Sequence, residues 1–259
     1  MKPGADYVTQ DGVGIIRFNR PEHSNPIDSK TAYLVADMAA EAEADRSIGA
    51  IIITGTGDKV FCSGMDLKEA ARKGAASIGM GHVVIPGTGF AGLTERHFTK
   101  PLIAAVNGAA VGGGCEIALT CDIIIAQETA IFSLPEVKRG LFAFSGGTQR
   151  VAKLLPRSEG MMMVLSGEPI TAKRLYKLGV VSQLVPTGQT LDAALAFAKL
   201  MLNNSWSALQ RAKKLFDLST TLSLDDALAV GNEIGFACFR EADAHEGISA
   251  FAEKREPKF

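Results

Sequence analysis

Hydrophobic residues along the chain alternate between short β-branched runs and longer stretches with helical spacing. Val13 to Phe18 is a short apolar run, and Ala50 to Thr54 (Ala-Ile-Ile-Ile-Thr) is apolar on both faces. Continuous apolar runs of this length are typical of buried strands. Between the two runs, residues 29–44 place their apolar positions on one face of a helix. The pattern therefore predicts a strand, a helix and a second strand, in this order.

The same alternation recurs further along the chain. Apolar runs predict strands over 101–106, 122–126 and 130–133, and the glycine triplet Gly112–Gly114 opens a helix toward Leu119. Beyond Thr148 the pattern is mostly helical, with helices expected at 150–155, 158–165, 171–178, 191–202 and throughout the tail that begins at Ser205. Strands alternating with helices and followed by a helical tail predict an α/β fold with a C-terminal helical subdomain.

One irregular stretch interrupts this order. Residues Gly74 to Gly92 are rich in glycine and have no clear period. Long loops inside compact domains are usually functional or mobile. The stretch is therefore either a wall of a pocket or a disordered surface insertion.

Composition and charge narrow the choice of function. The chain has 259 residues, 47% of them hydrophobic, which is enough to bury a large core. The formal net charge is -1 and no run of five basic residues occurs, so we expect no nucleic-acid partner. The four cysteines have no Cys-x-x-Cys spacing, which indicates reduced, mostly buried thiols. Without an N-terminal apolar run or a stretch of about 18 apolar residues, we expect no secretory signal, no membrane partner and a cytoplasmic location.

Three common kinds of site are poorly supported. Gly87 to Gly92 spells Gly-x-Gly-x-x-Gly, but Pro86 precedes it and Asn107, not an acid, follows the next strand, so nicotinamide binding is not expected. No pair of histidines has metal-ligand spacing. No serine lies in a Gly-x-Ser-x-Gly elbow, which argues against a serine hydrolase.

Two segments place small residues where the chain enters a helix. They are Phe61-Cys62-Ser63-Gly64-Met65-Asp66-Leu67-Lys68 and Asn107-Gly108-Ala109-Ala110-Val111-Gly112-Gly113-Gly114-Cys115-Glu116. Backbone N–H groups at a helix start lack partners and favour negative charge, and glycine lets a ligand approach the backbone closely. Two such N–H groups converging on one point would form an oxyanion hole. Two tight turns with good caps are the alternative.

Two carboxylates fall near these turns. Glu116 lies among apolar neighbours in the first turn of the predicted helix, where its charge has either a functional role or that of offsetting the helix dipole. Glu136 follows Pro135, whose ring restricts the backbone and holds the glutamate in a defined place. An ordinary solvated loop acid is the alternative at Glu136.

In this order, the motifs resemble the crotonase superfamily, the enoyl-CoA hydratases and isomerases. The resemblance covers nearly the whole chain. It rests on Asn19-Arg20-Pro21-Glu22, on Phe61 to Leu67, on Ala104 to Gly108 with the glycine triplet, on Leu134-Pro135-Glu136, on Gly146-Gly147-Thr148-Gln149-Arg150, and on Glu246 to Phe251 with Glu253-Lys254-Arg255.

The resemblance implies a crotonase-like spiral of β-β-α units over residues 1–200 and a C-terminal helical oligomerisation region over 201–259, which forms trimers or dimers of trimers. It implies that Met65 and Gly113 donate the N–H groups of the oxyanion hole and that Glu116 and Glu136 are the catalytic acid/base pair. Residues expected to bind the acyl-CoA thioester substrate are Asn25, Ser63, Asp66, Leu67 and Lys68, together with Phe251 and Lys254, which reach the coenzyme A of a neighbouring subunit.

The activity implied is addition of water across the 2,3 double bond of an enoyl-CoA thioester, with no metal and no cofactor beyond the coenzyme A of the substrate. Glu116 would activate the water and Glu136 would protonate the α carbon. Other crotonase reactions, namely double-bond isomerisation or a specialised dehydration, and a non-catalytic acyl-CoA-binding role are the alternatives. Phe142 and Phe144 depart from the usual glycine- and proline-rich segment and line either the acyl pocket or the core.

Overall fold

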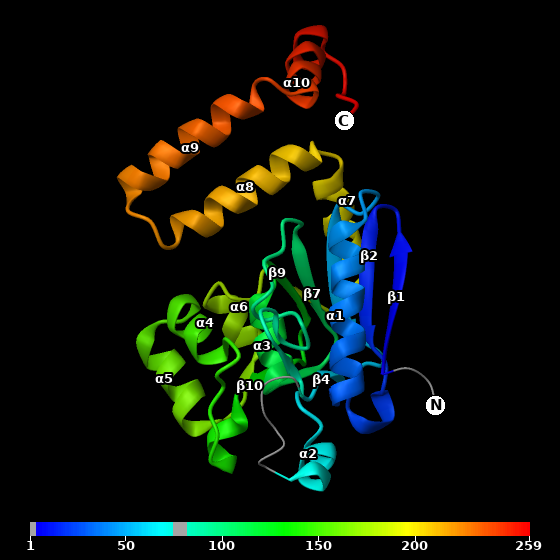
Figure 1. Ribbon diagram of the computed structural model, residues 1–259, viewed down its shortest axis with the longest axis vertical. Coiled ribbons are helices and arrows are strands. Elements are labelled where there is room, and N and C mark those ends of the chain that lie inside the picture. The colour runs from blue at the N-terminus through cyan, green and yellow to red at the C-terminus, as the bar shows by residue number, and fades with distance from the viewer. Residues whose placement is uncertain (1–3, 75–81) are drawn as a thin grey trace.

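Two sheets organise residues 4–74 and 82–259, the part of the chain that the computed structural model describes (Figure 1). The six-stranded sheet has the order β1 (Ala5–Gln10), β2 (Val13–Phe18), β3 (Ala50–Gly55), β7 (Leu102–Val106), β9 (Ile123–Gln127) and β12 (Gln183–Val185). The four-stranded sheet has the order β11 (Ile170–Thr171), β10 (Ile131–Ser133), β8 (Ala109–Val111) and β4 (Val60–Cys62). A separate hairpin pairs β5 (Val84–Ile85) with β6 (Gly89–Phe90).

Helices surround these sheets and then extend beyond them. The α-helices are α1 (Ser29–Ala44), α2 (Leu67–Lys73), α3 (Gly113–Thr120), α4 (Gly147–Leu154), α5 (Arg157–Ser166), α6 (Ala172–Lys177), α7 (Thr190–Leu202), α8 (Trp206–Ser219), α9 (Leu224–Cys238) and α10 (Ala242–Glu253). Two short 3-10 helices are η1 (Pro21–His23) and η3 (Pro135–Arg139).

A strand–strand–helix unit repeats three times along the chain. The units are β3–β4–α2, β7–β8–α3 and β9–β10–η3. The first strands of the three units are parallel neighbours in the six-stranded sheet, and the second strands are parallel neighbours in the four-stranded sheet. Each unit therefore adds one strand to each sheet and advances the chain by one step. The predicted α/β spiral of β-β-α units is confirmed.

The central strand β3 shows why the apolar pattern gives this architecture. All six of its residues are buried. Ile51 and Ile53 belong to the core that includes Val35 of α1, whereas Ile52 belongs to a second core that includes Ala194 of α7. Successive side chains of a strand point to opposite faces, so a strand covered by helices on both sides is apolar at every position.

Most predicted elements are present, and apart from β1, which has six residues, the missed strands are short. The strand and helix over 13–18 and 29–44 have the predicted bounds. The sequence gives no sign of β1, β4, β8 or β12, and β8 directly follows the predicted turn at Asn107-Gly108. Strands of three residues have too few positions for a period to be recognised, and their pairing depends on distant parts of the chain.

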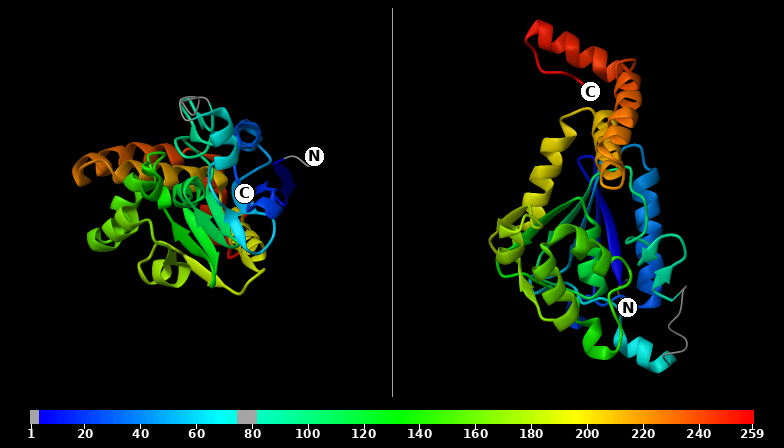
Figure 2. Two further views of the ribbon diagram at one scale, coloured as in Figure 1. Left: turned by 90° about the horizontal axis from the view of Figure 1, so that it is seen from below. Right: turned by 90° about the vertical axis from the view of Figure 1, so that its left-hand side faces the viewer.

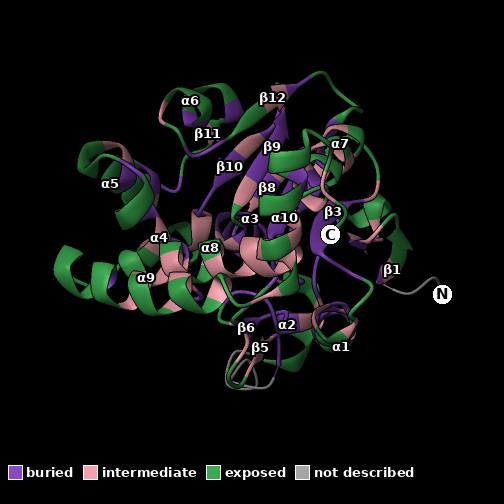
Figure 3. Cartoon of the chain, turned by 90° about the horizontal axis from the view of Figure 1, so that it is seen from above, coloured by how far each residue is buried: buried purple, intermediate pink, exposed green. Residues whose placement is uncertain are grey.

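The last three helices, α8 to α10, extend away from the sheets at the far end from α2 (Figures 1 and 2). Helices α8 and α9 pack against each other. Exposed and half-buried residues run along these helices (Figure 3). Large apolar side chains exposed on the helices or directly after α9 include Phe216, Leu224, Leu228, Phe236, Phe239 and Phe251. Among the described residues, no helix combines the length and apolar character needed to cross a membrane.

Candidate active site

The carboxyl ends of three parallel strands bring the candidate site together. Strands β4, β8 and β10 are neighbours in the four-stranded sheet. Residues 63–66 follow the first, 112–116 follow the second, and 135–136 follow the third. Since parallel strands end at the same edge, three segments that are distant in sequence meet there. Ligands of parallel α/β folds commonly bind at such an edge.

Gly64 brings the first two segments into close approach. Its φ of +82° is unfavourable for residues with a side chain. A methyl group at Gly64 would lie 2.9 Å from the backbone nitrogen of Gly113 and 2.9 Å from the carbonyl oxygen of Val111. A glycine is therefore required for the turn that carries Met65 to lie against the start of α3.

The N–H groups of Met65 and Gly113 are available to a ligand. The Ile27 N–H donates to the Gly64 oxygen (2.8 Å) and the Asp66 N–H donates to the Ile27 oxygen (2.9 Å), which fixes the backbone on either side of Met65. Among the hydrogen bonds of the described residues, none has the N–H of Met65 or Gly113 as its donor. The Gly113 N–H is one of the free donors at the start of α3, where the helix dipole also favours negative charge.

Phe90, at the end of β6, covers Gly113. Any side chain at Gly113 would collide with the Phe90 ring. Phe90 is itself buried and belongs to the main hydrophobic core. The part of the predicted pocket wall at 74–92 that the structure describes thus includes a residue in contact with the site, whereas positions 75–81 lie outside the described residues. The Gly-x-Gly-x-x-Gly motif falls in the β5–β6 hairpin rather than between a strand and a helix.

Glu116 is held in the first turn of α3 and is only 4% exposed. The N–H of Gly147, the first residue of α4, donates to its Oε1 atom at 3.0 Å. Burial, together with the charge of Glu136, raises the pKa of Glu116 to about 7, against the opposing effects of the N–H groups of Gly147 and Ser145 and of Arg150. The carboxyl group is therefore fixed in place and close to half protonated at neutral pH.

Glu136 lies directly after Pro135 in the 3-10 helix η3, and not in an open loop, the alternative that the sequence left. One carboxylate oxygen, Oε2, is buried and has no hydrogen-bond partner among the described residues. The other, Oε1, would lie 3.0 Å from a methyl group placed on Gly112. Burial also raises the pKa of Glu136. A buried carboxylate oxygen without a partner destabilises the fold and is a common mark of a functional group.

Two of the predicted substrate-binding residues have their side chains engaged within the protein. Asn25 is 1% exposed, and its amide donates to the oxygens of Thr56 and Val60 while its Oδ1 accepts from the Arg20 N–H. Asp66 caps α2 by accepting from the N–H groups of two later residues. Both residues thereby fix the loops that surround Met65.

An ion pair determines the charge state of Asp66. Its carboxylate lies 3.1 Å from the guanidinium of Arg20, which also bonds Asp28 at 3.0 Å. Burial alone would raise the pKa of Asp66, but the N–H of Glu69 and the Arg20 guanidinium outweigh it and lower the pKa. Asp66 is therefore an ionised helix cap at neutral pH.

The other predicted binding residues fall into two groups. Ser63 is half-buried beside Met65, and Leu67 and Lys68 are exposed at the start of α2, so these three lie around the candidate site. Phe251 and Lys254 belong to the α10 end of the molecule, opposite α2 (Figure 1), and Phe251 is 88% exposed. Within one chain these two residues are not brought to Glu116 and Glu136.

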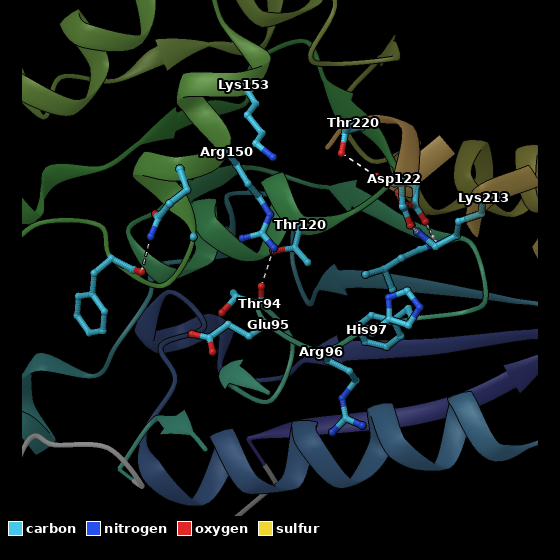
Figure 4. Close-up of a pocket in the computed structure, with 16 residues that line it drawn as sticks. Thr94, Glu95, Arg96, His97, Thr120, Asp122, Arg150, Lys153, Lys213 and Thr220 are labelled. Atoms are coloured by element: carbon cyan, nitrogen blue, oxygen red, sulfur yellow. Dashed lines mark hydrogen bonds and ion pairs between the residues drawn. The ribbon is translucent and has the colours of Figure 1, made fainter. Parts of the chain in front are cut away.

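A cavity of about 570 Å³ lies on the other side of α4, and neither glutamate lines it (Figure 4). Its wall is mostly polar and includes Thr94, Asp122, Arg150, Lys153 and Lys213. Over residues 4–74 and 82–259, no group of three or more histidine, cysteine, aspartate or glutamate side chains is placed to hold a metal ion.

Sequence reasoning missed the contacts that α4 makes with the site. The expected start of this helix was residue 150, whereas it begins at Gly147, so the Gly147 N–H was not recognised as a donor. The glycine pair at 146–147 was a usable signal, because free N–H groups at a helix start are natural partners of a carboxylate.

The model of one protein family, described as "Enoyl-CoA hydratase/isomerase", matches residues 8–259. The chain is 39% identical over 251 residues to the 2,3-dehydroadipyl-CoA hydratase of Escherichia coli, covering 96% of each protein. It is 37% identical over 257 residues to the carnitinyl-CoA dehydratase of Salmonella paratyphi B, covering 97% of this chain and 96% of that one.

Solved structures give the same picture. The crystal structure of an enoyl-CoA hydratase from Mycobacterium marinum superposes with a TM-score of 0.91 at 40% identity, covering 99% of this chain and 98% of that one. A carnitinyl-CoA dehydratase from Mycobacterium avium superposes with a TM-score of 0.76 at 38% identity, again covering 99% and 98%. The similarity therefore includes the C-terminal helices as well as the two sheets.

Proposed function

Because the chain belongs to the enoyl-CoA hydratase/isomerase family, we propose that it adds water across the 2,3 double bond of an enoyl-CoA thioester, with Glu116 and Glu136 as the acid/base pair. Family membership confirms the resemblance to the crotonase superfamily and makes the chain an enzyme of the hydro-lyase type. The observation that carries the proposal is the meeting of a buried and a half-buried glutamate, both with raised pKa values, and two free N–H donors at one edge of a sheet.

The N–H groups of Met65 and Gly113 would bind the thioester carbonyl oxygen. Attack of water at the β carbon moves electrons onto the carbonyl oxygen and forms an enolate-like species. Donors already held in place stabilise the developing charge more than they stabilise the ground state. A single donor of this kind contributes on the order of 3 kcal/mol to the transition state. The close approach at Gly64 supports this role, since it holds both donors on rigid backbone.

The two carboxyl groups would share the proton transfers. Glu116, ionised, takes a proton from water as the water oxygen bonds to the β carbon. Glu136, protonated, gives its proton to the α carbon as the enolate collapses. One proton is taken up and one is released, so the pair ends with the proton on Glu116. A positioned acid or base of this kind contributes about 10²–10⁴-fold to the rate.

A pair that holds one proton would catalyse both hydration and the reverse reaction, dehydration. The charge of Glu136 contributes to the raised pKa of Glu116, which favours the state with Glu136 ionised and the shared proton on Glu116. That state is the starting state for dehydration of a 3-hydroxyacyl thioester, and moving the proton to Glu136 gives the starting state for hydration. Two of the relatives, both carnitinyl-CoA dehydratases, are named for this reverse direction, the removal of water.

Substrate binding would involve more than one copy of the chain. Ser63, Leu67 and Lys68 lie beside the donors, with Asn25 and Asp66 fixing their loops. We propose residues 1–200 as the spiral core and 201–259 as the oligomerisation region of a trimer or dimer of trimers. The exposed apolar side chains of α8 to α10 support this, because such surfaces usually mark protein contacts. Phe251 and Lys254 would then reach the coenzyme A bound to a neighbouring copy, and sedimentation equilibrium tests the assembly.

Coenzyme A would enter with the substrate, and the proposed chemistry uses no further cofactor. Each step above is assigned to a backbone N–H or a carboxyl group of the chain. The cytoplasm stays a prediction from the sequence, in keeping with four cysteines that are all free thiols.

Incubating the purified protein with straight-chain 2-enoyl-CoA thioesters of increasing length, beginning with the four-carbon one, tests the proposal. We expect loss of the conjugated thioester absorbance and formation of the 3-hydroxyacyl thioester by mass spectrometry. Parallel incubation with 3-enoyl thioesters separates the alternatives. Conversion of these to 2-enoyl products, without addition of water to any 2-enoyl thioester, would identify an isomerase. Tight coenzyme A binding without turnover of either series would indicate a binding protein.

A further inference from the structure

Arg150 joins two parts of the site that are far apart in the sequence. It lies on α4, and its guanidinium extends to the segment that follows β6, where Nη2 donates to the carbonyl oxygen of Thr94 at 2.6 Å (Figure 4). The guanidinium also packs against the backbone of Gly146, where a side chain would displace it and where a φ of +105° favours glycine. Arg150 thus contacts both its own helix start and a distant loop.

Each end of this link leads to a different part of the site. At the α4 end, Gly147 donates its N–H to Glu116. At the other end, the hydroxyl of Thr94 accepts the N–H of Phe90 at 2.8 Å, and the Phe90 ring packs on Gly113. Thr94 is 1% exposed, so water does not compete for these bonds.

We propose that Arg150 is a positioning residue that, through Thr94, keeps the carboxylate of Glu116 and the N–H of Gly113 in one fixed geometry. The inference rests on the proposed function, because it assumes that Glu116 and Gly113 act on the substrate. A displacement of a reacting group by about 1 Å is enough to cost roughly 10²-fold in rate. A bond that fixes both groups at once therefore affects the rate even though it touches no substrate.

The charge of Arg150 adds an effect that its hydrogen bond alone would not have. The groups that face it are Glu116 and Cys121 of α3 and Glu95 of the loop. The groups that face Glu116 are Glu136 of η3, Arg150 of α4 and the N–H groups at 145 and 147. Arg150 is thus the cation among these groups, and it favours the ionised form of Glu116.

The experiment compares Arg150→Met, Arg150→Lys and Thr94→Val in hydration of the four-carbon 2-enoyl thioester across pH. Arg150→Met should lower kcat about tenfold with KM changed by less than about twofold, and should move the alkaline limb of kcat/KM upward by about half a pH unit. Arg150→Lys should leave that limb in place but still lower kcat. Thr94→Val should lower kcat without moving the limb, and Thr94→Ser should restore it.

Lys153→Met is the matched control, because Lys153 is an exposed cation on the same helix and lines the same cavity. It should leave kcat and the limb unchanged. If Arg150→Met matches this control while circular dichroism shows a folded protein, the inference is wrong. Glu116→Gln separates this failure from that of the proposed function: full hydration activity in Glu116→Gln would overturn the catalytic pair itself, whatever Arg150 does.

Discussion

Glu116 and Glu136 face the same site from surroundings of different kinds. Glu116 lies in an α-helix packed against a second helix, is 4% exposed, and accepts the N–H of Gly147. Glu136 lies in a short 3-10 helix that leads into an exposed loop, where Phe142 and Phe144 are 62% and 53% exposed. One oxygen of Glu136 has no partner among the described residues.

The difference indicates a division of roles. A carboxylate that is held by a backbone donor is suited to orient a small molecule such as water, because its own position does not change. A carboxyl group with a free oxygen is suited to exchange a proton with a carbon that changes geometry during the reaction. The rings of Phe142 and Phe144 in the loop after η3 lie 5.9 Å apart edge to face, and both side chains are exposed rather than part of the core.

Glu136→Gln tests the member of the pair that has an oxygen without a partner, and it should have the largest effect. We expect kcat for hydration to fall by about 10³–10⁴-fold, since the amide of glutamine cannot deliver the proton assigned to Glu136. Substrate binding should persist, because the N–H donors are untouched. Steady-state kinetics with a binding measurement separates the two. A loss below tenfold would contradict the assigned role.

Glu116→Gln tests the fixed member and should cost about 10³-fold in kcat, because the water then lacks a base. The glutamine amide oxygen can still accept the Gly147 N–H, so the fold should be retained. An isomerase needs one carboxylate, and for an isomerase this variant would be far less damaging than Glu136→Gln. Comparable severe losses in both variants therefore favour the hydratase.

Gly64→Ala tests the N–H donors of Met65 and Gly113, on which the roles of both carboxyl groups depend. The new methyl group would lie 2.9 Å from the Gly113 nitrogen, so the Met65 turn must move away from α3. We expect kcat to fall by about 10²-fold or more, the size typical of one lost donor. Gly179→Ala is a suitable control, because Gly179 has a similar φ of +80° and no atom within 4 Å of the new methyl group. Equal losses in the two variants would mean that backbone strain, not the donors, is responsible.

The pH dependence sharpens the comparison further. The pKa of Glu116 is about 7 and is raised in part by an ionised Glu136, so the last proton of the pair leaves near neutral pH. Above that pH both groups are ionised and no acid remains. We expect kcat/KM to fall about tenfold per pH unit at alkaline pH, with the acid limb set by Glu136. A profile that rises steadily from pH 7 to pH 9 would contradict this account.

Stability should show the cost of burying Glu116. A carboxyl group whose pKa is raised on folding stabilises the fold relative to its ionised form below its unfolded pKa, and loses this contribution as pH rises through the folded value. For Glu116, this contribution is lost between about pH 4.5 and about pH 7. Glu116→Gln should therefore be more stable than the wild type at pH 8, by about 2–3 kcal/mol. Chemical denaturation of both proteins at pH 5 and pH 8 checks this, since the difference should shrink to less than about 1 kcal/mol at pH 5, near the lower end of the window.

Local sequence patterns could predict the strands and helices around Glu116 well. The buried runs of β3 and β7, the helix α1 and the glycine triplet before Glu116 all carry signals within a few residues. The partners of Glu116 could not be predicted in the same way. Gly147 lies 31 positions away, and the bond from Arg150 to Thr94 spans 56 positions. Such contacts form only when the three β-β-α units stack on one another. The local hydrophobic pattern of the sequence therefore does not predict them.

The sequence could predict Glu136 as a candidate site residue, but not the surroundings of its carboxyl group. Pro135 indicates a fixed backbone, yet the 3-10 helix and the unpartnered Oε2 depend on the neighbouring turns of the spiral. The same limit applies to Asn25, whose amide donates to the backbone oxygen of Val60, and to Asp66, whose carboxylate pairs with Arg20, 46 positions away.

A double-mutant cycle on hydration tests the central claim most directly, namely that Glu116 and Glu136 act as a unit on one water. It compares kcat of the wild type, Glu116→Gln, Glu136→Gln and the double variant. Groups that act as a unit give strongly non-additive losses, so the double variant should be about as slow as the slower single variant. If the losses instead multiply, or if either single variant keeps near wild-type activity, the two carboxyl groups do not form a catalytic pair.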